Sequence, residues 1–422
     1  MKLTAENKYQ LLRQISLQIR DTLDLDEILN QLLDMIQATV SYDAAGIFVL
    51  NQDLIHGRHE QPKEIIASVV WRGFDAQRPP EMDPMLSLGK GLIGHVISTG
   101  ESLVVPDVRL DSRYVVGREG TLSEIVVPIV RNDQPIGALN LESNQLAAYN
   151  QEDVEVLLFF ADAASISIEK AMLHRQLLEN KQIEMQLKMA QAIQSRLLPA
   201  EPPVLVGYDI AGTCLPTYEI GGDYYDFIQL PQEQWGLVVA DVSGEGIPAA
   251  MIMAIFRALL RTHARAGGET AVIAQTMNRL LPDFTGGIDF VTAVFGVLVP
   301  DSGQFTYTNC GHNPPLLLRA DGRVDTLTQG GPLLSILLGA VYRAAQVTLQ
   351  VGDLLVLYTD GVVEVMSKEG EEFGLARLQA VLHDAHSLPA QTIIERIIQA
   401  TQLFSGAANY RDDFTCMVVK RG

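Results

Sequence analysis

The chain has 422 residues, 47% of them hydrophobic, and a formal net charge of −20. This length fits two domains, each with enough apolar residues for its own core. The acidic surplus is shared by both halves, which argues against a nucleic acid or an anionic membrane surface as a partner.

Cysteine usage and the first residues bear on the compartment. Cys214, Cys310 and Cys416 show neither the pattern of a disulfide framework nor the spacing of a zinc site. The opening MKLTAENKYQ lacks the apolar core of a signal peptide, and no stretch reaches the roughly 18 apolar residues of a spanning helix. We therefore expect a cytoplasmic protein.

The first part of the chain combines helical and strand-like segments. Residues 7–40 keep apolar side chains at three- and four-residue spacing, broken near TLDLDE, where Thr22 or Asp24 is placed to cap a second helix. Short β-type runs follow at AAGIFVL, EIIASVV, SLVVPDV, EIVVPIV and PIGALNLE. Polar or Gly/Pro-containing stretches separate these runs, a pattern typical of an antiparallel sheet in an α+β domain.

A long helix without Gly or Pro is predicted over residues 151–198. Its apolar residues recur at intervals of seven and then of four: Ala171, Leu178, Met185, Met189, Ile193 and Leu197. Such a stripe either packs on the helix's own domain or pairs with a second helix. Because the helix is longer than a compact domain needs, we favour a linking coiled coil and hence a homodimer.

After residue 204 a second alternation of strands and helices begins. Strand-like runs occur at LVVAD, FVTAVFGVLVP, QFTYTNC, PPLLLRA, DLLVLYTD and FTCMVVK. Helical stretches are predicted over residues 248–266, 271–281 and 375–402. The pattern predicts a layered sandwich of sheets covered by helices.

The stretch LVVADVSGEGIPAAM contains Gly244, Gly246 and Ala249 in a GxGxxA pattern between a strand and a helix. A dinucleotide site also needs an acidic residue about 20 positions further on, at the end of a second strand. This chain has RTHARAG there, and no Lys-Ser/Thr pair follows as in a triphosphate-binding loop. A nucleotide-dependent oxidoreductase is therefore the weakest interpretation.

Aspartates border apolar strands at four places, in three of them close to glycine: Asp223, Asp241, Asp360 and the pair Asp412 and Asp413. Any one of them alone is an ordinary turn residue. Brought together at converging strand ends they repel one another and need a cation. Oxygen ligands select Mg²⁺ or Mn²⁺, and adjacent carboxylates hold two such ions about 3.5–4 Å apart with an activated water, which hydrolyses phosphate esters.

The motifs EIGGDYYDF, VVADVSGEGIPAAM, YTNCGHNPPLLL, LVLYTDGVVE and RDDFT resemble, in this order, those of the metal-dependent Ser/Thr protein phosphatases (PPM, type 2C) in their bacterial sporulation and stress-response branch. The resemblance covers about residues 200–422. It implies a helix-flanked β-sandwich with two Mn²⁺ or Mg²⁺ ions in its cleft. It implies that Asp223 and Asp241 bridge the ions, that the backbone carbonyl of Val242 contacts one, and that Asp360 and Asp412 hold the other.

The same resemblance extends to residues around these ligands. Asp413 and Gly361 are expected to support them, and Asp226 is either an acceptor behind the ligands or a solvated turn residue. His312 either donates a proton to the leaving group, orients a ligand, or bonds the backbone within a rigid Gly-His-Asn-Pro turn. The arginine that grips phosphate in the eukaryotic relatives has no obvious substitute here.

Residues of about 10–170 resemble a GAF domain, through GLIGHVISTGESLVVPDVRLDSRY and VVPIVRNDQPIGALNLES. GAF domains bind small molecules against their sheet or only dimerise. The resemblance names no ligand, because the cyclic-nucleotide type expects Asn-Lys, Phe and Asp-Glu where this chain has Asn144-Gln145, Tyr149 and Glu152-Asp153. A thioether-linked bilin is excluded, since no cysteine precedes residue 214.

We therefore expect an α+β protein with a GAF sensor domain over residues 1–150 (flanking helix to about 170), a coiled-coil linker over 151–200, dimerising through about 151–198, and an αββα phosphatase domain over 201–422. The expected function is Mn²⁺/Mg²⁺-dependent dephosphorylation of serine or threonine in a STAS-type anti-anti-sigma regulator. The alternative is a phosphatase-like binding module that only transmits a GAF signal. We expect that signal to reach helix 248–266.

Overall fold

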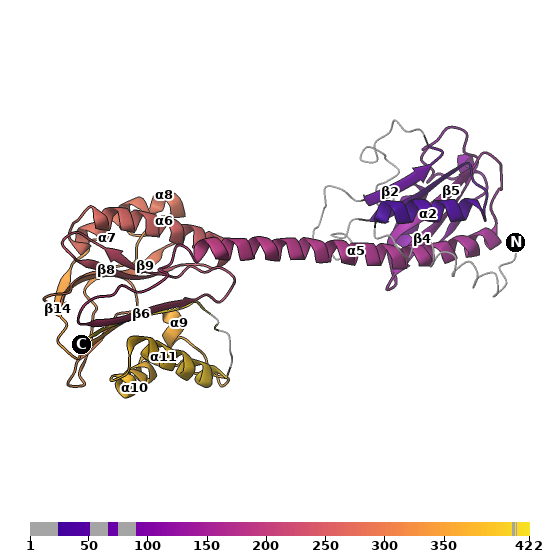
Figure 1. The fold of residues 1–422 in the computed structure, drawn as a ribbon. Helices are drawn as coiled ribbons and strands as arrows, with labels where there is room; N and C mark the ends of the chain where they lie inside the picture. The colour runs from indigo at the N-terminus through magenta and orange to yellow at the C-terminus, as the bar shows by residue number, and fades with distance from the viewer. Residues whose placement is uncertain (1–23, 51–65, 75–89, 407–409, 411) are drawn as a thin grey trace. The chain divides into compact units, whose positions relative to one another are not determined.

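The computed structural model describes residues 24–50, 66–74, 90–406, 410 and 412–422 (Figure 1). The chain divides into two units, Met1–Gln182 and Ile183–Gly422. Thr22 and the first part of the helical segment predicted over residues 7–40 lie outside the described residues.

The N-terminal unit is built on an antiparallel sheet in the order β2-β1-β5-β4-β3. Its strands are β1 (Ala44–Leu50), β2 (Ile66–Arg72), β3 (Leu103–Val105), β4 (Ser123–Arg131) and β5 (Gln134–Ser143). Helix α2 (Leu25–Gln37) precedes them, and the Asp24 side chain caps it by accepting the Glu27 N–H at 3.0 Å. The five β-type runs of the sequence thus form the predicted sheet.

Both faces of this sheet are covered. On β4, Ile125 and Val127 pack with α2 and the first part of α5 (Gln151–Gln194), whereas Val126 packs with α4 (Gly91–Thr99) on the other face. Alternate strand residues point to opposite faces, so a strand buried on both sides needs apolar residues at nearly every position. This is why EIVVPIV reads as a continuous apolar run with one conspicuous exception, Glu124.

The C-terminal unit contains two sheets. The first has the order β13-β10-β9-β8-β7 with β14 paired to β10, and the second has the order β12-β11-β15-β16-β6. The strands of the first are β7 (Tyr224–Gln229), β8 (Trp235–Val242), β9 (Val291–Val299), β10 (Gln304–Cys310), β13 (Gly330–Gly331) and β14 (Ala345–Thr348). Those of the second are β6 (Tyr208–Leu215), β11 (Leu316–Leu318), β12 (Val324–Thr326), β15 (Leu354–Tyr358) and β16 (Phe414–Arg421).

These sheets form the inner layers of a four-layer sandwich (Figure 1). Apolar side chains such as Val239 of β8 and Leu355 of β15 share one cluster between the sheets. Helices α6 (Gly246–Arg265) and α7 (Thr270–Leu280) pack on the outer face of the first sheet, and α10 (Gly374–Ala385) and α11 (Ala390–Ser405) on that of the second. The predicted α+β class and αββα arrangement are confirmed.

Two details differ from the sequence-based prediction. The single helix predicted over residues 375–402 is two helices, because α10 ends at Ala385 and Pro389 caps the start of α11. Strands β7, β12, β13 and β14 were not predicted, and neither was β6, whose sequence YDIAGTCL mixes small and polar residues. It pairs with β16 over its whole length, from Tyr208 opposite Arg421 to Leu215 opposite Phe414.

Of the described helices, α6 alone is long and apolar enough to cross a membrane by length and composition. Its residues Met253, Phe256 and Leu260 are buried against β7 and β8 in the core of the C-terminal unit. A third of the most apolar window of α6 is buried within this unit.

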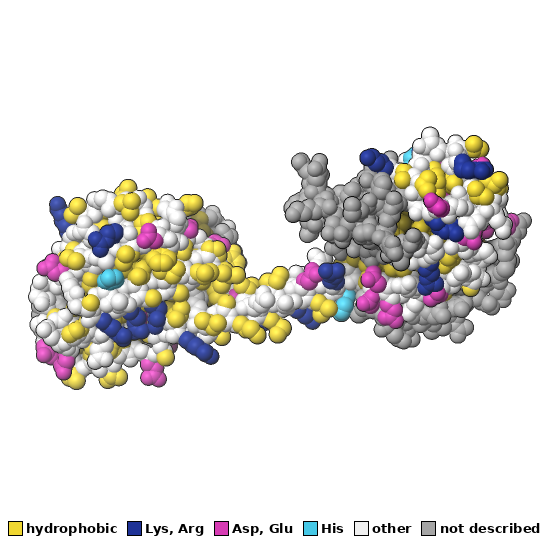
Figure 2. All heavy atoms as spheres, turned by 90° about the horizontal axis from the view of Figure 1, so that it is seen from above, with side chains coloured by type: hydrophobic (Ala, Val, Ile, Leu, Met, Phe, Trp, Pro, Cys, Tyr) yellow, Lys and Arg dark blue, Asp and Glu magenta, His cyan; other side chains and the backbone are white. Residues whose placement is uncertain are grey.

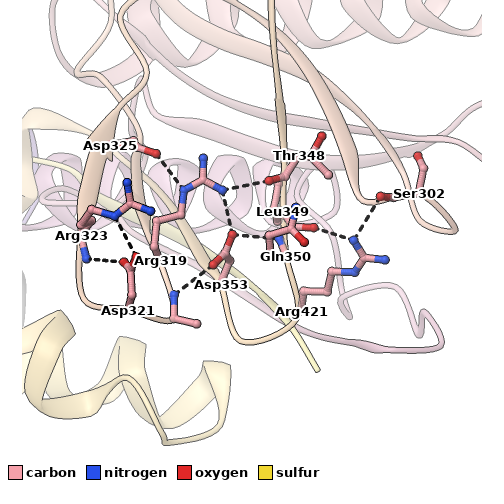
Figure 3. Close-up of polar contacts among 11 residues, drawn as sticks. Ser302, Arg319, Asp321, Arg323, Asp325, Thr348, Leu349, Gln350, Asp353 and Arg421 are labelled. Carbon is pink, nitrogen blue, oxygen red and sulfur yellow. Dashed lines mark hydrogen bonds and ion pairs between the residues drawn. The ribbon is translucent and has the colours of Figure 1, made fainter.

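A polar network closes the end of the sandwich where β15 begins and β16 ends (Figure 3). Asp353 is 1% exposed and accepts from Arg319 Nη1 at 2.9 Å and from the Gln350 N–H at 2.8 Å. Arg421 donates to the carbonyl oxygens of Leu349 and Ser302. Asp360 and Asp412 border the opposite ends of these strands. The network therefore stabilises the end of the sandwich that is remote from the predicted site.

The packing of α6 predicts the effect of a core truncation. Phe256 is 1% exposed, and its ring centroid lies 5.9 Å from that of Tyr224. Phe256→Ala is expected to lower the free energy of unfolding by about 3–5 kcal/mol, because it leaves a cavity against β7. The measurement is denaturant unfolding followed by Trp235 fluorescence in a Trp71→Phe background. Phe284→Ala, at a side chain 52% exposed, is the control, and an equal loss there would contradict this packing.

Candidate metal centre

The four predicted ligands come in pairs from the two facing sheets. Asp223 directly precedes β7, and Asp241 lies next to the end of β8 in the same sheet. Asp360 begins the short helix α9 (Asp360–Val363) after β15, and Asp412 precedes β16 in the other sheet. Asp223 is buried, Asp241 and Asp360 are half-buried and Asp412 is exposed.

Asp413 connects the two halves of the site. Its Oδ1 accepts the Thr217 N–H and its Oδ2 accepts the Gly222 N–H, both at 2.8 Å. The hydroxyl of Thr359, at the end of β15, lies 2.8 Å from Asp223 Oδ2. Asp413 therefore positions the loop that carries Asp223, in keeping with the supporting place that the sequence predicts for it.

Glycines permit these close approaches. A Cβ at Gly221 would lie 2.0 Å from Asp413 Oδ2, and one at Gly361 would lie 2.0 Å from the Asp413 carbonyl oxygen. A Cβ at Gly222 would lie 2.7 Å from the carbonyl oxygen of Val242. Each side chain would displace backbone or carboxylate atoms, so the glycines of EIGGDYYDF and TDGVVE are required by space.

Burial and mutual repulsion act on the pKa of every one of these aspartates. Burial and the neighbouring Asp241 hold the pKa of Asp223 well above its usual range. Burial and the nearby carboxylates raise the pKa of Asp241 to about 7 and that of Asp360 to about 6. Burial also raises the pKa of Asp412. The site is thus an unbalanced concentration of negative charge.

This donor set fits a divalent cation. The charged neighbours that raise the pKa of Asp241 are all carboxylates: Asp360, Asp412, Asp413 and Glu364. Among the residues that the structure describes, no three acidic, His or Cys side chains lie close enough together to enclose an ion as they stand. Carboxylate oxygens suit Mn²⁺ or Mg²⁺, and such ions are commonly held by one or two carboxylates with waters in their remaining positions.

Two acidic residues near the site were missed by the sequence reasoning. Glu364 lies one helical turn after Asp360 and raises the pKa of both Asp360 and Asp241. Glu245, in the VSGEG turn, raises the pKa of Asp412. Both lie next to a motif that contains a predicted ligand, and this closeness in sequence could have marked them as part of the site.

Asp226 has a different role from the four ligands. It is 2% exposed, accepts from the Tyr224 hydroxyl, and pairs with Arg261 of α6 at 2.9 Å. Its own carboxylate also accepts the Phe227 N–H. It joins β7 to α6 inside the core, so the interpretation as a solvated turn residue does not describe it.

His312 is held by the fold through both ring nitrogens. Nδ1 lies 2.7 Å from Thr292 Oγ1, and Nε2 lies 3.1 Å from the carbonyl oxygen of Tyr358. Since a carbonyl only accepts, Nε2 carries the proton and Nδ1 accepts from the threonine. Burial lowers the pKa of His312 to about 4. Of the alternatives left open by the sequence, this geometry fits the rigid turn in which the histidine bonds the backbone.

A cavity of about 280 Å³ adjoins Asp223, formed by the end of α5 and the loop before β7. Its lining includes Lys188, Gln191, Gln194, Glu219, Gly221 and Asp223. The Gln194 side chain donates to the Gly221 carbonyl oxygen at 2.7 Å and accepts the Gly221 N–H at 3.2 Å. The last residue of α5 thus clamps the loop that positions Asp223.

Comparison with known protein families supports the two-part organisation. Residues 231–422 match the family model "Stage II sporulation protein E (SpoIIE)", and residues 22–169 match a GAF domain model. The C-terminal domain belongs to the SpoIIE-type PP2C phosphatases, and the N-terminal domain is a GAF domain. The SpoIIE match contains Asp241, Asp360 and Asp412, whereas Asp223 lies before its first residue.

Individual relatives agree with this assignment. The chain is 29% identical over 266 residues to Protein IcfG of Synechocystis, covering 56% of this chain and 42% of that protein. It is 28% identical over 244 residues to Phosphoserine phosphatase RsbU of Bacillus subtilis, covering 57% of this chain and 71% of RsbU. The chain thus matches less than half the length of one relative and about two thirds of the other.

A solved structure shares the fold of the phosphatase domain. The SiaA-PP2C domain of Pseudomonas aeruginosa superposes with a TM-score of 0.52 at 21% identity, over 57% of this chain and 98% of that domain. At this identity the likeness supports the β-sandwich architecture alone.

The close approach of Gly221 to Asp413 yields a test of the site. Gly221→Ala places a methyl group where the Asp413 carboxylate lies, so this variant should bind Mn²⁺ about tenfold or more weakly, measured by isothermal titration calorimetry. Gly339→Ala is the matched control, since nothing lies within 4 Å of its Cβ position. Unchanged affinity in Gly221→Ala would show that this loop does not shape the site.

Proposed function

We propose that the chain is a Mn²⁺- or Mg²⁺-dependent phosphatase that removes phosphate from serine or threonine of a regulatory protein. The observation that carries the proposal is that Asp223 and Asp241 of one sheet and Asp360 and Asp412 of the other lie near enough to raise the pKa of their neighbours in this group. The raised pKa values of these aspartates support it, because the charged groups that the structure describes around them are mainly other carboxylates.

The roles of the residues follow from this geometry. When bound, the ions would supply an activated water and stabilise charge on the phosphoryl group. Asp223 and Asp241 would hold both ions from the buried side, with the carbonyl of Val242 beside them, and Asp360 and Asp412 would hold the more exposed one. Asp413, Thr359 and Gly361 keep the two sheets in register around this space.

We propose a phosphoserine- or phosphothreonine-containing anti-anti-sigma regulator of the STAS type as the substrate, in the cytoplasm. The motif resemblance to the stress-response branch supports this substrate. The relatives named phosphoserine phosphatase RsbU and phosphoserine phosphatase RsbP, both of Bacillus subtilis, support a phosphorylated amino acid as the target.

The rival proposal is a catalytically inactive domain that only transmits a signal from the GAF domain. The bacterial branch that the motifs resemble also lacks the phosphate-gripping arginine, so its absence does not separate the two proposals. All four candidate ligands are nevertheless present, together with the glycines that their packing requires. The two proposals differ in whether turnover depends on the aspartates.

We further propose that α5 makes the protein a homodimer and carries the GAF signal. Its middle portion exposes large apolar side chains, 50–64% accessible, and Figure 2 shows hydrophobic atoms along it: Leu173, Leu177, Leu178, Ile183, Met185, Met189 and Ile193. The two ends of the predicted stripe pack within the two units: Ala171 lies in the core of the first, and Leu197 packs against the core of the second. The exposed middle is available for a second helix.

Two contacts support a route for that signal. Gln194 clamps Gly221 in the Asp223 loop, and the carbonyl oxygen of Leu197 accepts from Arg257 of α6 at 2.6 Å. A shift in the end of α5 therefore acts on both the Asp223 loop and the helix that follows Asp241.

Activity tests the proposed function directly. With Mn²⁺, the protein should hydrolyse a phosphoserine peptide, and Asp360→Asn should lower kcat/KM by about 100-fold or more, because it removes a charged ligand. Asp384→Asn, at an exposed position on α10, should leave turnover unchanged. Metal-dependent turnover that survives Asp360→Asn would refute the site.

The role of α5 is tested by charge on its exposed stripe. The Leu178→Glu, Met185→Glu double variant should lower both dimerisation, measured by analytical ultracentrifugation, and phosphatase activity, because like charges would face each other across the helix pair. Lys181→Glu, on the same exposed stretch, is the control. If the double variant is a fully active monomer, the proposed role of α5 is contradicted.

A further inference from the structure

The GAF domain buries a group of polar side chains inside its apolar layer, unrelated to the metal centre. Glu124 of β4 lies directly opposite Glu142 of β5 in the strand register, with Asn140 two residues before Glu142 on the same face. Glu124 is 1% exposed, and Glu142 and Asn140 are fully buried. Like charges directly opposite in a sheet destabilise it, so this pair is not explained by the fold.

The hydrogen bonds within this Glu124 cluster (Thr121, Glu124, Asn140 and Glu142) satisfy its members unequally. Glu142 accepts from the Thr121 hydroxyl at 2.5 Å, and the guanidinium of Arg118 lowers its pKa. Asn140 Nδ2 lies 3.3 Å from Glu124 Oε1 and 3.4 Å from Glu142 Oε1. Burial and Glu142 hold the pKa of Glu124 well above its usual range, and no cation among the described residues lowers it.

Two acceptor atoms of the cluster remain without a hydrogen-bond partner among the described residues: Glu124 Oε2 and Asn140 Oδ1. Both are buried, and an unmade hydrogen bond at such a site costs about 1–3 kcal/mol for each group. A Cβ at Gly46 would lie 2.8 Å from Asn140 Oδ1 and 2.7 Å from the Phe48 ring, so the glycine allows both side chains to pack against β1. The cluster thus presents acceptors that await donors.

The surroundings select the kind of donor. The same layer is lined by Phe48, Leu92, Val96 and Val126, which form the apolar cluster under α4. In the part of the chain that the structure describes, no group of three His, Cys, Asp or Glu side chains suits a metal ion. An ammonium group offers three donors and a positive charge, and an attached hydrocarbon body would pack on the apolar side chains.

We propose that the GAF domain binds a small molecule with a primary ammonium group, held by Glu124, Glu142 and Asn140, and an aliphatic body that packs under α4. The ammonium donates to Glu124 Oε2 and Asn140 Oδ1 and neutralises the facing carboxylates. This binding site is separate from the metal centre and does not depend on phosphatase activity.

The test uses the full-length protein and amide hydrogen exchange of peptides from β4 and β5. Methylamine, n-butylamine and n-hexylamine are the probes, and n-butanol is the matched neutral compound. We expect n-butylamine to slow exchange in both strands at concentrations where n-butanol has no effect, and affinity to rise with chain length. Equal effects of amine and alcohol, or no effect of any amine, would overturn the proposal.

A charge-removing variant locates the site. Glu124→Gln should weaken n-butylamine binding about tenfold or more, since it removes a charge-assisted acceptor, while Glu155→Gln, at an exposed position of the same domain, should bind as the wild type does. Wild-type affinity in Glu124→Gln would contradict the assignment. Should Glu124→Gln fail to fold, Glu142→Gln replaces it, and the comparison of amine with alcohol in the wild type remains decisive.

Discussion

Repulsion among carboxylates is the constraint on which the C-terminal domain depends. Asp223 and Asp241 are brought towards Asp360 and Asp412 by two sheets whose facing surfaces are apolar, so the strands cannot move apart without exposing the core between them. The polar network around Asp353 and Arg421 closes the other end of the same strands. The fold thus concentrates negative charge at one end and is held together at the other.

The sequence could propose the ligands because each aspartate borders an apolar strand, with a glycine close by at three of the four places. It could not predict which glycine approaches which atom, since Gly221 and Asp413 are far apart in the chain and meet only when the two sheets pack. The same holds for Asp226, whose motif looked like a turn although its partner Arg261 comes from a helix that packs on β7.

Secondary structure shows the same limit. Apolar runs such as DLLVLYTD became strands as predicted, because burial on both faces leaves a continuous signal. Strand β6 was not predicted because it is an edge strand of mixed composition, which depends on β16 for its pairing. The break between α10 and α11 was missed although Pro389 marks it, because the apolar periodicity continues across the turn.

Carboxylates lie close to one another in both domains. In the GAF domain two facing glutamates lie in an apolar layer, and in the phosphatase domain four aspartates face one another beside a cavity. Helix α5 joins these domains in sequence, and its last residue contacts the loop of Asp223 through Gln194. A cation bound at either group, as proposed above, would offset the repulsion among its carboxylates.

The measurement that tests this account most directly is anomalous diffraction at the manganese absorption edge, from crystals of the protein grown with Mn²⁺. The account predicts two anomalous peaks among Asp223, Asp241, Asp360 and Asp412, with Asp413 bonded to the Gly221–Gly222 backbone and outside the coordination shell. An anomalous map without a peak among these four aspartates would contradict it.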